Sequence, residues 1–253
     1  MRFTGKAAII TGGASGIGRA TALRFAREGA AVAIFDKNAA NGEAVRQELA
    51  SAGTHASFLN VDVAMEEEVT QAVRQVEDEF QRIDILVNNA AAFVFGSYQA
   101  SQSDWQHVLS VNVMGAALCT KYVAPAMIRC GGGSIVNVTS ISAFIAQEQS
   151  LPYNTSKAAL LGLNRCLAMD LAPHRIRVNA VAPGCIDTPQ LRADIARAGL
   201  TYEQDLAIEG PLHLLNRFGT AEEVSSAIAF LASDEASFIT GTCLMVDGGY
   251  TAK

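Results

Sequence analysis

Short apolar runs alternate with longer amphipathic segments along most of the chain. The runs are too brief for helices, are rich in β-branched residues and end in polar or glycine residues, so each predicts a strand buried on both faces. The predicted strands span residues 7–11, 31–36, 58–62, 85–89, 135–140, 176–182 and 243–247. Between them, apolar residues recur every three or four positions, which predicts amphipathic helices. One such set is Val69, Ala72, Val73 and Val76.

This alternation predicts an α/β fold. Strands that alternate with helices form right-handed crossovers and a parallel sheet. No repeat, low-complexity tract or Pro/Ser-rich linker interrupts the pattern. We therefore expect residues 1–253 to form a single doubly wound domain, in which about seven parallel strands carry helices on both faces as three α/β/α layers. Capping boxes at Ser103–Gln106 and Thr220–Glu223 predict two of the helix starts.

The stretch at about 187–216 departs from this pattern. Its apolar residues belong to no strand, and Gly199, Gly210 and Pro211 interrupt it. Two interpretations are open: a flap that covers a substrate pocket, or a plain pair of surface helices.

Composition and charge restrict the class of partner. Of the 253 residues, 50% are hydrophobic and 17% charged, as is typical of a globular protein. The net charge is −6, and lysine and arginine form no cluster. This argues against nucleic acid or an anionic membrane as partner and favours a small molecule.

Cysteine and histidine positions suggest neither disulfides nor a metal. The five cysteines include no Cys-x-x-Cys pair, and the four histidines are scattered, so we expect no metal site. The N-terminus has no signal-peptide pattern, and no run of about 18 apolar residues predicts a membrane span. We therefore expect a cytoplasmic protein.

A glycine-rich turn follows the first predicted strand and opens the first helix. Glycines at positions 12, 16 and 18 allow a tight turn and a close approach of the backbone to a pyrophosphate. An ordinary strand-to-helix turn is the alternative. Asp36 ends the second strand, 18 positions after Gly18, where its carboxylate can accept bonds from ribose hydroxyls and repel a 2′-phosphate. The pattern predicts NAD rather than NADP, and Lys37 is the one nearby cation that weakens this preference.

Tyr153 and Lys157 stand four residues apart, on one face of a predicted helix. An ammonium beside a phenol stabilises the phenolate and lowers the pKa of the tyrosine toward neutrality, which suits a general acid/base. The alternative is a solvated helix face.

With the glycine turn, this pair resembles the short-chain dehydrogenase/reductase family over essentially the whole chain, which implies a Rossmann-like fold. The resemblance implies catalytic roles for Asn112, Ser140, Tyr153 and Lys157. Ser140 lies 13 positions before Tyr153 and would orient the substrate oxygen, although Ser142 is a competitor. Asn112 would hold a water that connects Lys157 to solvent.

The resemblance also implies the cofactor contacts. Asp62 and Val63 would meet the adenine, and residues 183–188 the nicotinamide and diphosphate. Ala91 stands where the family's Asn-Asn-Ala-Gly element has glycine. The implied cofactor-binding residues are Gly12, Ser15, Gly16, Ile17, Gly18, Asp36, Asp62, Val63, Asn89, Ala90, Tyr153, Lys157, Pro183, Gly184, Ile186 and Thr188.

These residues predict reversible hydride transfer between a nicotinamide and a secondary alcohol or ketone. Most candidate wall residues are apolar, which favours a small cyclic or hydrophobic substrate, but Gln147 and Glu148 would equally suit a sugar or polyol. The candidate walls are Phe93, Val94, Phe95, Ile141, Phe144, Gln147, Glu148, Leu151 and the stretch 187–216.

Two other functions remain open at this point. Reduction of 3-oxoacyl thioesters on an acyl carrier protein is also found in the family, but Asp36 and the negative charge count against it. A relative that binds NAD without turnover is the alternative outside enzymes. The resemblance further implies a homotetramer.

Overall fold

A computed structural model describes residues 1–253 and places a seven-stranded parallel sheet at the centre of the protein. The strand order is β3-β2-β1-β4-β5-β6-β9, so it reverses direction between β1 and β4. Ligands of such sheets bind at this switch point, beyond the carboxyl ends of the strands. The strands are β1 (Ala7–Thr11), β2 (Ala31–Asp36), β3 (Ala56–Asn60), β4 (Ile85–Asn88), β5 (Gly133–Val138), β6 (Ile176–Pro183) and β9 (Cys243–Val246).

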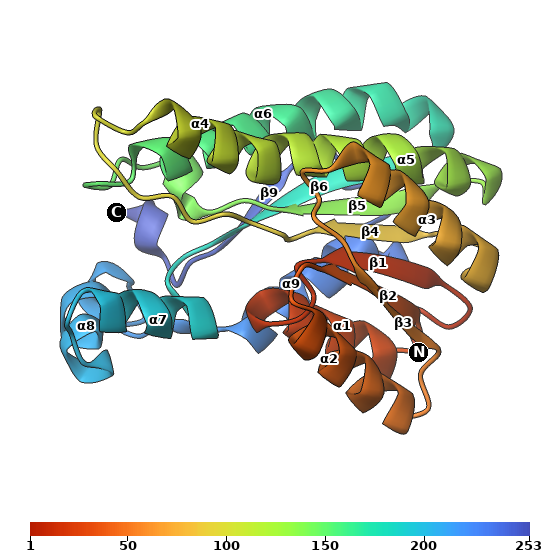
Figure 1. Ribbon diagram of the computed structural model, residues 1–253, viewed down its shortest axis with the longest axis horizontal. Coiled ribbons are helices and arrows are strands. Elements are labelled where there is room, and N and C mark those ends of the chain that lie inside the picture. The colour runs from red at the N-terminus through yellow and green to blue at the C-terminus, as the bar shows by residue number, and fades with distance from the viewer.

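Helices cover both faces of the sheet, as Figure 1 shows. On one face lie α3 (Glu66–Phe80), α4 (Gln102–Leu109), α5 (Ala116–Arg129) and α6 (Leu151–Leu171). On the other lie α1 (Gly16–Arg27), α2 (Ala39–Ser51) and α9 (Ala221–Ala232). The predicted doubly wound, three-layer α/β/α fold is confirmed.

Two hydrophobic cores of 21 buried residues each lie on opposite sides of the sheet. Successive residues of a strand point to opposite faces, so Ala8 and Ile10 pack into one core and Ile9 into the other. This double burial explains why the strands are uninterrupted apolar runs instead of alternating patterns.

Several predicted boundaries are wrong by a few residues. β3 and β5 each begin and end two residues earlier than the apolar runs suggested, and the buried residues Val61 and Thr139 lie just beyond the ends of these strands. The capping box of α4 joins Ser101 to Asp104. The predicted box from Ser103 to Gln106 is wrong. The Asp104 carboxylate accepts the Ser101 backbone N–H at 2.9 Å, so the helix begins two residues earlier than predicted. The box at Thr220 is confirmed.

The stretch 187–216 forms two short helices, α7 (Pro189–Arg197) and α8 (Tyr202–Glu209). They project as a separate lobe beyond the carboxyl ends of the strands, across from α4 (Figure 1). A two-residue pairing that the sequence did not predict ties the lobe to the body, between β7 (Ile186–Asp187) and β8 (Gly219–Thr220).

The continuous helical stretch Gln102–Arg129 is long and apolar enough to cross a membrane by length and composition alone. The prediction from sequence found no such run. However, 56% of its apolar window is buried inside the protein, where it packs in the layer with α3 and α6. Burial against the sheet therefore accounts for its apolar character.

A chain of buried asparagines crosses the sheet. The Asn88 amide donates to Asn137 Oδ1 at 2.9 Å, and the Asn137 amide donates to Asn164 Oδ1 at 3.0 Å. All three side chains are buried. These hydrogen bonds between asparagine side chains therefore couple β4, β5 and α6, the elements that carry the site described below.

Asn137→Ala leaves a donor on Asn88 and an acceptor on Asn164 without their partner. Each buried group that loses its bond costs about 1–3 kcal/mol, so for the two groups the free energy of unfolding in urea should fall by about 2–6 kcal/mol. Asn41→Ala, at an exposed position of α2, is the matched control and should change it by less than about 0.5 kcal/mol. Equal effects of the two substitutions would show that the buried chain contributes little.

Candidate active site

A cavity of about 430 Å³ opens at the switch point between β1 and β4. The turn after β1 forms one of its walls. Gly12 has φ +65°, and a Cβ there would lie 2.8 Å from Asn89 Nδ2. A Cβ on Gly18 would lie 2.1 Å from the Gly12 carbonyl oxygen, so only glycine allows the helix to approach the turn this closely.

The start of α1 is open to an anion. Ser15 is the N-cap residue, but its hydroxyl makes no capping bond, and the first turn contains no acidic residue. The first amides of α1 therefore keep their hydrogen-bonding capacity and the positive end of the helix dipole. These features fit the pyrophosphate of a dinucleotide.

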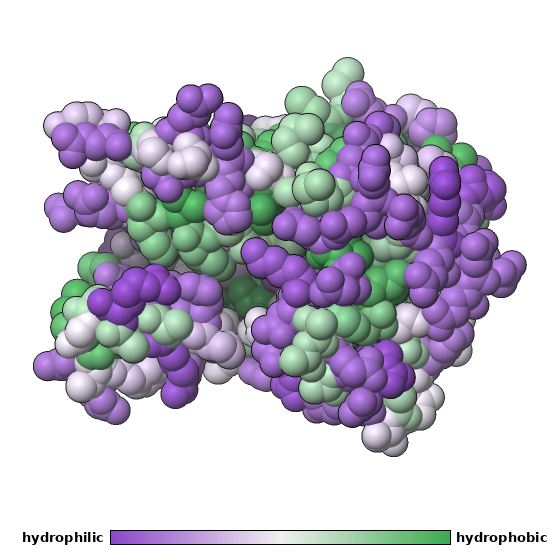
Figure 2. Space-filling view, in the orientation of Figure 1, coloured by the Kyte–Doolittle hydropathy of each residue, from purple (hydrophilic) through white to green (hydrophobic).

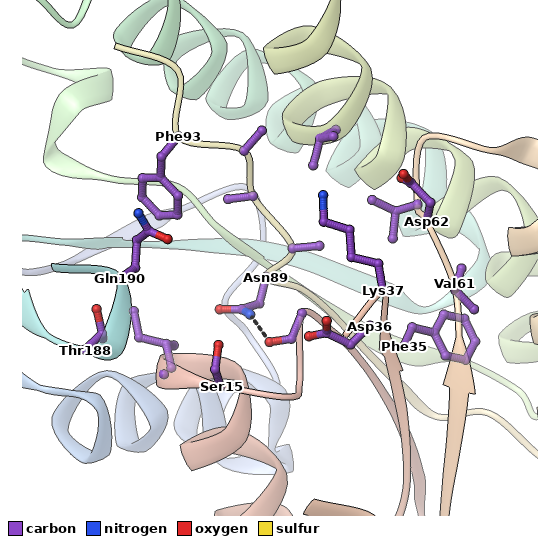
Figure 3. A pocket seen from close by; sticks show the side chains of 18 of the residues that line it. Ser15, Phe35, Asp36, Lys37, Val61, Asp62, Asn89, Phe93, Thr188 and Gln190 are labelled. Carbon is purple, nitrogen blue, oxygen red and sulfur yellow. Dashed lines mark hydrogen bonds between the residues drawn. The ribbon is translucent and has the colours of Figure 1, made fainter. Parts of the chain in front are cut away.

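Most of the predicted cofactor residues lie around this cavity, as Figure 3 shows in part. Those that line it are Gly12, Ser15, Gly16, Ile17, Asp36, Asp62, Val63, Asn89, Ala90 and Thr188. Lining residues that the sequence did not identify as cofactor contacts include Phe35, Val61, His107, Val111 and Gln190. No pattern in the sequence marks them, because they face the cavity only through the fold.

Six predicted cofactor residues do not line the cavity; two of them, Tyr153 and Lys157, are described below. Gly18 is buried beneath the turn, and Pro183 is the buried last residue of β6. Gly184 packs against His213 and Asp247, where a Cβ would meet their atoms at 2.8 and 3.0 Å. Ile186 is buried in β7.

The Asp36 carboxylate is held by backbone amides at the edge of the cavity. Oδ2 accepts the Ala14 N–H at 3.0 Å, and Oδ1 accepts the Asn38 N–H at 2.9 Å. In Figure 3 the Lys37 side chain extends across the cavity beside it. The Asp36 carboxylate thus lies at the end of the cavity opposite Phe93 and Gln190, with the exposed cation of Lys37 next to it.

Asn89 connects the two central strands at this point. Its side-chain amide donates to the carbonyl oxygens of Thr11 and Gly12, both at 3.0 Å. The backbone amides of Asn89 and Ala90 donate in return to Thr11 Oγ1, also at 3.0 Å. This clamp fixes the glycine turn against the segment that follows β4.

Tyr153 and Lys157 are buried in the first turns of α6, with exposed fractions of 9% and 2%. Lys157 Nζ lies 5.6 Å from the centre of the Tyr153 ring and donates to the Val138 carbonyl oxygen at 3.0 Å. Ser140 follows β5, and its hydroxyl favours the ionised form of Tyr153, which lowers the pKa of the phenol. The fold therefore brings these three predicted residues together.

The pKa values of the pair move in the directions that burial dictates. Burial raises the pKa of Tyr153 above its ordinary value; the Ser140 hydroxyl opposes this rise, and the charges of Asp194 and Cys185 add to it. Burial lowers the pKa of Lys157 to about 8. In the protein without cofactor, the ammonium of Lys157 bonds a carbonyl, and the cost of burying a phenolate prevails at Tyr153.

Asn112 lies in a π-helical turn, Ser110–Gly115, between α4 and α5. Its Oδ1 accepts the Ala92 N–H at 2.7 Å, and its amide donates to the Ala92 carbonyl oxygen and to Ser156 Oγ at 3.0 and 2.9 Å. Both amide hydrogens are thus committed to the protein. The side chain holds the segment after β4 against α6.

Aromatic rings surround the Tyr153 phenol. Phe93 stacks on it with ring centres 5.3 Å apart, and Phe95 lies at 5.9 Å. These two phenylalanines are 43% and 48% exposed. Phe93 also lines the cofactor cavity, so it joins that cavity to the catalytic group. Figure 2 shows apolar surface gathered in this hollow, between the α4 side and the lobe of α7 and α8.

A buried histidine positions the loop after β6. His213 Nε2 accepts the Cys185 N–H at 3.2 Å, and its Nδ1 pairs with the Glu209 carbonyl oxygen at 3.0 Å. It links the end of α8 to residues 184–188. The sequence offered only a lone histidine here, which carries no recognisable signal.

Lys157→Met removes a cation whose burial opposes folding. Because the pKa of Lys157 falls from 10.5 to about 8, the unfolded chain binds more protons than the folded one between those values, and wild-type stability rises with pH through this window. At pH 7 the variant should be about 1–3 kcal/mol more stable to urea, and this advantage should shrink near pH 10. Lys253→Met, at an exposed position, is the control. A variant less stable than wild type at pH 7 would contradict the claim that burial of the Lys157 ammonium opposes folding.

The chain matches known proteins over nearly its full length. A family model described as enoyl-(acyl carrier protein) reductase matches residues 12–251. A solved short-chain type dehydrogenase/reductase from Mycobacterium marinum superposes with a TM-score of 0.92 at 35% identity, covering 99% of this chain and 97% of that one. The chain belongs to the short-chain dehydrogenase/reductase family.

Two further relatives are enzymes with defined substrates. The cis-4-hydroxycyclohexanecarboxylate dehydrogenase of Sinomonas cyclohexanicum is 41% identical, over 99% of this chain and 98% of its own. A 7α-hydroxysteroid dehydrogenase, solved with NADH and 7-oxo glycochenodeoxycholic acid, has a TM-score of 0.90 at 34% identity, over 98% of this chain and 95% of its own. Membership of the family makes the present chain an oxidoreductase that acts on CH–OH groups with a nicotinamide cofactor.

Proposed function

We propose that the protein is an NAD-dependent dehydrogenase that interconverts a small cyclic or otherwise hydrophobic secondary alcohol and its ketone. The observation that carries this proposal is the placement of Tyr153. Lys157 Nζ lies 5.6 Å from the centre of its ring, and the half-exposed rings of Phe93 and Phe95 pack against it. A site that places a proton acceptor next to apolar side chains suits an apolar alcohol.

Each polar residue then has one task. Tyr153 Oη takes the proton of the substrate hydroxyl, and Ser140 Oγ holds the substrate oxygen next to it. Lys157 Nζ binds the ribose hydroxyls of the cofactor. The nicotinamide, when bound, supplies the hydride acceptor and a positive charge near the phenol. That charge favours the phenolate, which the protein alone does not. Asn112 positions these groups through Ala92 and Ser156.

The cavity supports the cofactor assignment. Thr188 and the residues of the glycine turn would hold the diphosphate, and Asp62 and Val63 the adenine. The fixed carboxylate of Asp36 would accept bonds from the ribose hydroxyls and repel a 2′-phosphate, which favours NAD over NADP. The remaining contacts, from Pro183 to Ile186, would act through the backbone.

The cyclic substrate class has support from two sides. The relatives described above act on a cyclohexane ring and on a steroid, both of which carry a ring hydroxyl or ketone. In this chain the corresponding hollow is lined by apolar side chains (Figure 2). The lobe of α7 and α8 would cover the substrate.

Reduction of the 3-oxo group of an acyl thioester on an acyl carrier protein is the second candidate. The description of the matching family model names the same carrier but a different reaction, the reduction of an enoyl group. The net charge of −6 offers an acidic carrier little attraction, however, and Asp36 disfavours NADPH. A sugar or polyol substrate would need polar walls, for which Gln147 and Glu148 are the candidates from the sequence. Cytoplasmic location and a homotetramer remain predictions.

Tyr153→Phe removes the proton acceptor and keeps the ring stack. Turnover of a cyclic alcohol should fall by a factor of about 10³ or more, while the Kd for NAD changes by less than about threefold. Tyr98→Phe, at an exposed tyrosine, should leave both unchanged. Substantial turnover by Tyr153→Phe, measured as NADH formation, would exclude the proposed role.

Asp36→Asn removes the charge at the ribose and retains an oxygen that can accept a backbone amide. The ratio of kcat/KM with NADPH to that with NADH should rise by about tenfold or more, because the repulsion of a 2′-phosphate is lost. Asp78→Asn on the exposed face of α3 is the control. If wild type already prefers NADPH, the cofactor assignment is wrong.

A further inference from the structure

We propose that His213 is a positioning residue for the cofactor, which holds the loop 184–188 only while its imidazole is neutral, so that protonation of His213 weakens cofactor binding. The inference rests on the proposed function, which places this loop against the nicotinamide and the diphosphate. It adds a residue outside the cavity that sets the cofactor affinity, and it follows from the two hydrogen bonds of one buried side chain.

The partners of His213 fix the position of its proton. The Glu209 carbonyl oxygen, 3.0 Å from Nδ1, can only accept, so Nδ1 carries the proton. The Cys185 N–H donates to Nε2 at 3.2 Å, so Nε2 presents its lone pair. The side chain is 1% exposed, which prevents water from replacing either partner freely. His213 is therefore held as the neutral Nδ1–H tautomer.

The bond from Cys185 fixes the start of the loop. The Gly184 amide donates to the last residue of β9 at 3.1 Å, and β7 begins one residue after Cys185. Between these two anchors, His213 is the acceptor of the Cys185 amide. Farther along the loop, Thr188 lines the cofactor cavity. A shift of the Cys185 backbone would thus displace the residues proposed to hold the nicotinamide and the diphosphate.

Protonation of His213 is incompatible with this bond. A second proton on Nε2 would point at the Cys185 N–H, so that two donors would face each other and the loop amide would lose its acceptor. The loss of one neutral hydrogen bond corresponds to about a fivefold change in affinity. Only the neutral imidazole therefore positions the loop.

Acidic side chains lie near the imidazole but form no ion pair with it. On α8, Glu209 Oε2 accepts the Cys185 thiol at 3.6 Å, and Asp205 is half-buried on the same helix. After β9, the Asp247 carboxylate accepts two backbone amides at 2.9 Å. These charges favour a proton on the imidazole and burial opposes it, but both ring nitrogens already face backbone groups. An imidazolium would therefore gain no direct partner in exchange for the lost bond.

The other titratable groups around His213 carry no free charge toward it. The Tyr250 ring lies edge-on with centres 5.1 Å apart, and burial raises the pKa of its phenol. Arg217 lines a neighbouring cavity with His213 and is paired with Glu223 at 2.6 Å. Lys253 Nζ donates to a backbone carbonyl oxygen at 3.1 Å. The titration of His213 itself is thus the event that changes the bond to the loop.

Two substitutions separate this bond from general support by the ring. His213→Gln can place an amide oxygen near the position of Nε2, as an acceptor that does not titrate. His213→Asn can keep the bond to Glu209 but is too short to reach Cys185. His174→Gln, at an exposed histidine, is the control.

The test measures the Kd of NADH, and in parallel that of NADPH, by fluorescence titration of the full chain. At about pH 8, wild type and His213→Gln should agree within about twofold, and His213→Asn should bind about fivefold more weakly. From about pH 8 to about pH 5, where histidine becomes protonated, the Kd should rise about fivefold more in wild type and His174→Gln than in the His213 variants. His107 lines the cavity but is present in every protein compared, so its titration cancels.

Parallel pH profiles of wild type and His213→Gln would overturn the proposal, and so would equal weakening by His213→Gln and His213→Asn at about pH 8, which indicates support by the ring alone. A preference of wild type for NADPH would instead contradict the cofactor assignment, and the comparison of variants would then be made with NADPH.

A measurement on the protein without cofactor tests the same bond independently of the proposed function. At about pH 8, nitrogen NMR should show a protonated Nδ1 and an unprotonated Nε2 in His213. At about pH 5, the Cys185 amide should exchange with solvent faster in wild type than in His213→Gln, whereas the two should exchange alike at about pH 8. A proton on Nε2 at about pH 8, or equal exchange at both pH values, contradicts the inference even if no cofactor binds.

Discussion

The clamp between Thr11 and Asn89 is the interaction on which the site depends. Four hydrogen bonds of 3.0 Å join the end of β1 to the end of β4, where the strand order reverses. On one side of the clamp, the glycine turn opens the first amides of α1 toward the cavity. On the other, the segment after β4 places Phe93 against Tyr153. The proposed cofactor and catalytic parts of the site therefore meet at one hydrogen-bonded junction.

Burial decides the electrostatics of the catalytic pair. Without the cofactor, the apolar surroundings favour a neutral phenol, and they lower the pKa of Lys157 to about 8. Burying the Tyr153 phenolate and the Lys157 ammonium is thus unfavourable until a ligand with its own charge and hydroxyls is present. In the proposed mechanism, this coupling would keep proton transfer at Tyr153 dependent on a bound cofactor.

The sequence predicted the architecture well because parallel strands buried on both faces leave a strong local pattern. It also identified Ser140, Tyr153 and Lys157, which the fold brings together although β5 and α6 are separate elements. Strand ends were less accurate, since a residue such as Val61 is buried whether or not its backbone joins the ladder. The π-helical turn at Asn112, the His213 contacts and the stack of Phe93 on Tyr153 could not be predicted, because each depends on partners distant in the chain.

The direction of the pKa shift of Tyr153 could not be predicted from the sequence for a similar reason. Proximity of Tyr153 and Lys157 along a helix is visible in the spacing, but burial and the bond from Lys157 to Val138 are not.

The most direct test of the proposed function is NADH formation by the wild-type protein with NAD and a panel of cyclic alcohols, open-chain secondary alcohols and polyols. We expect cyclic apolar alcohols to give the highest kcat/KM. Turnover restricted to polyols, or no NADH with any alcohol, would contradict it.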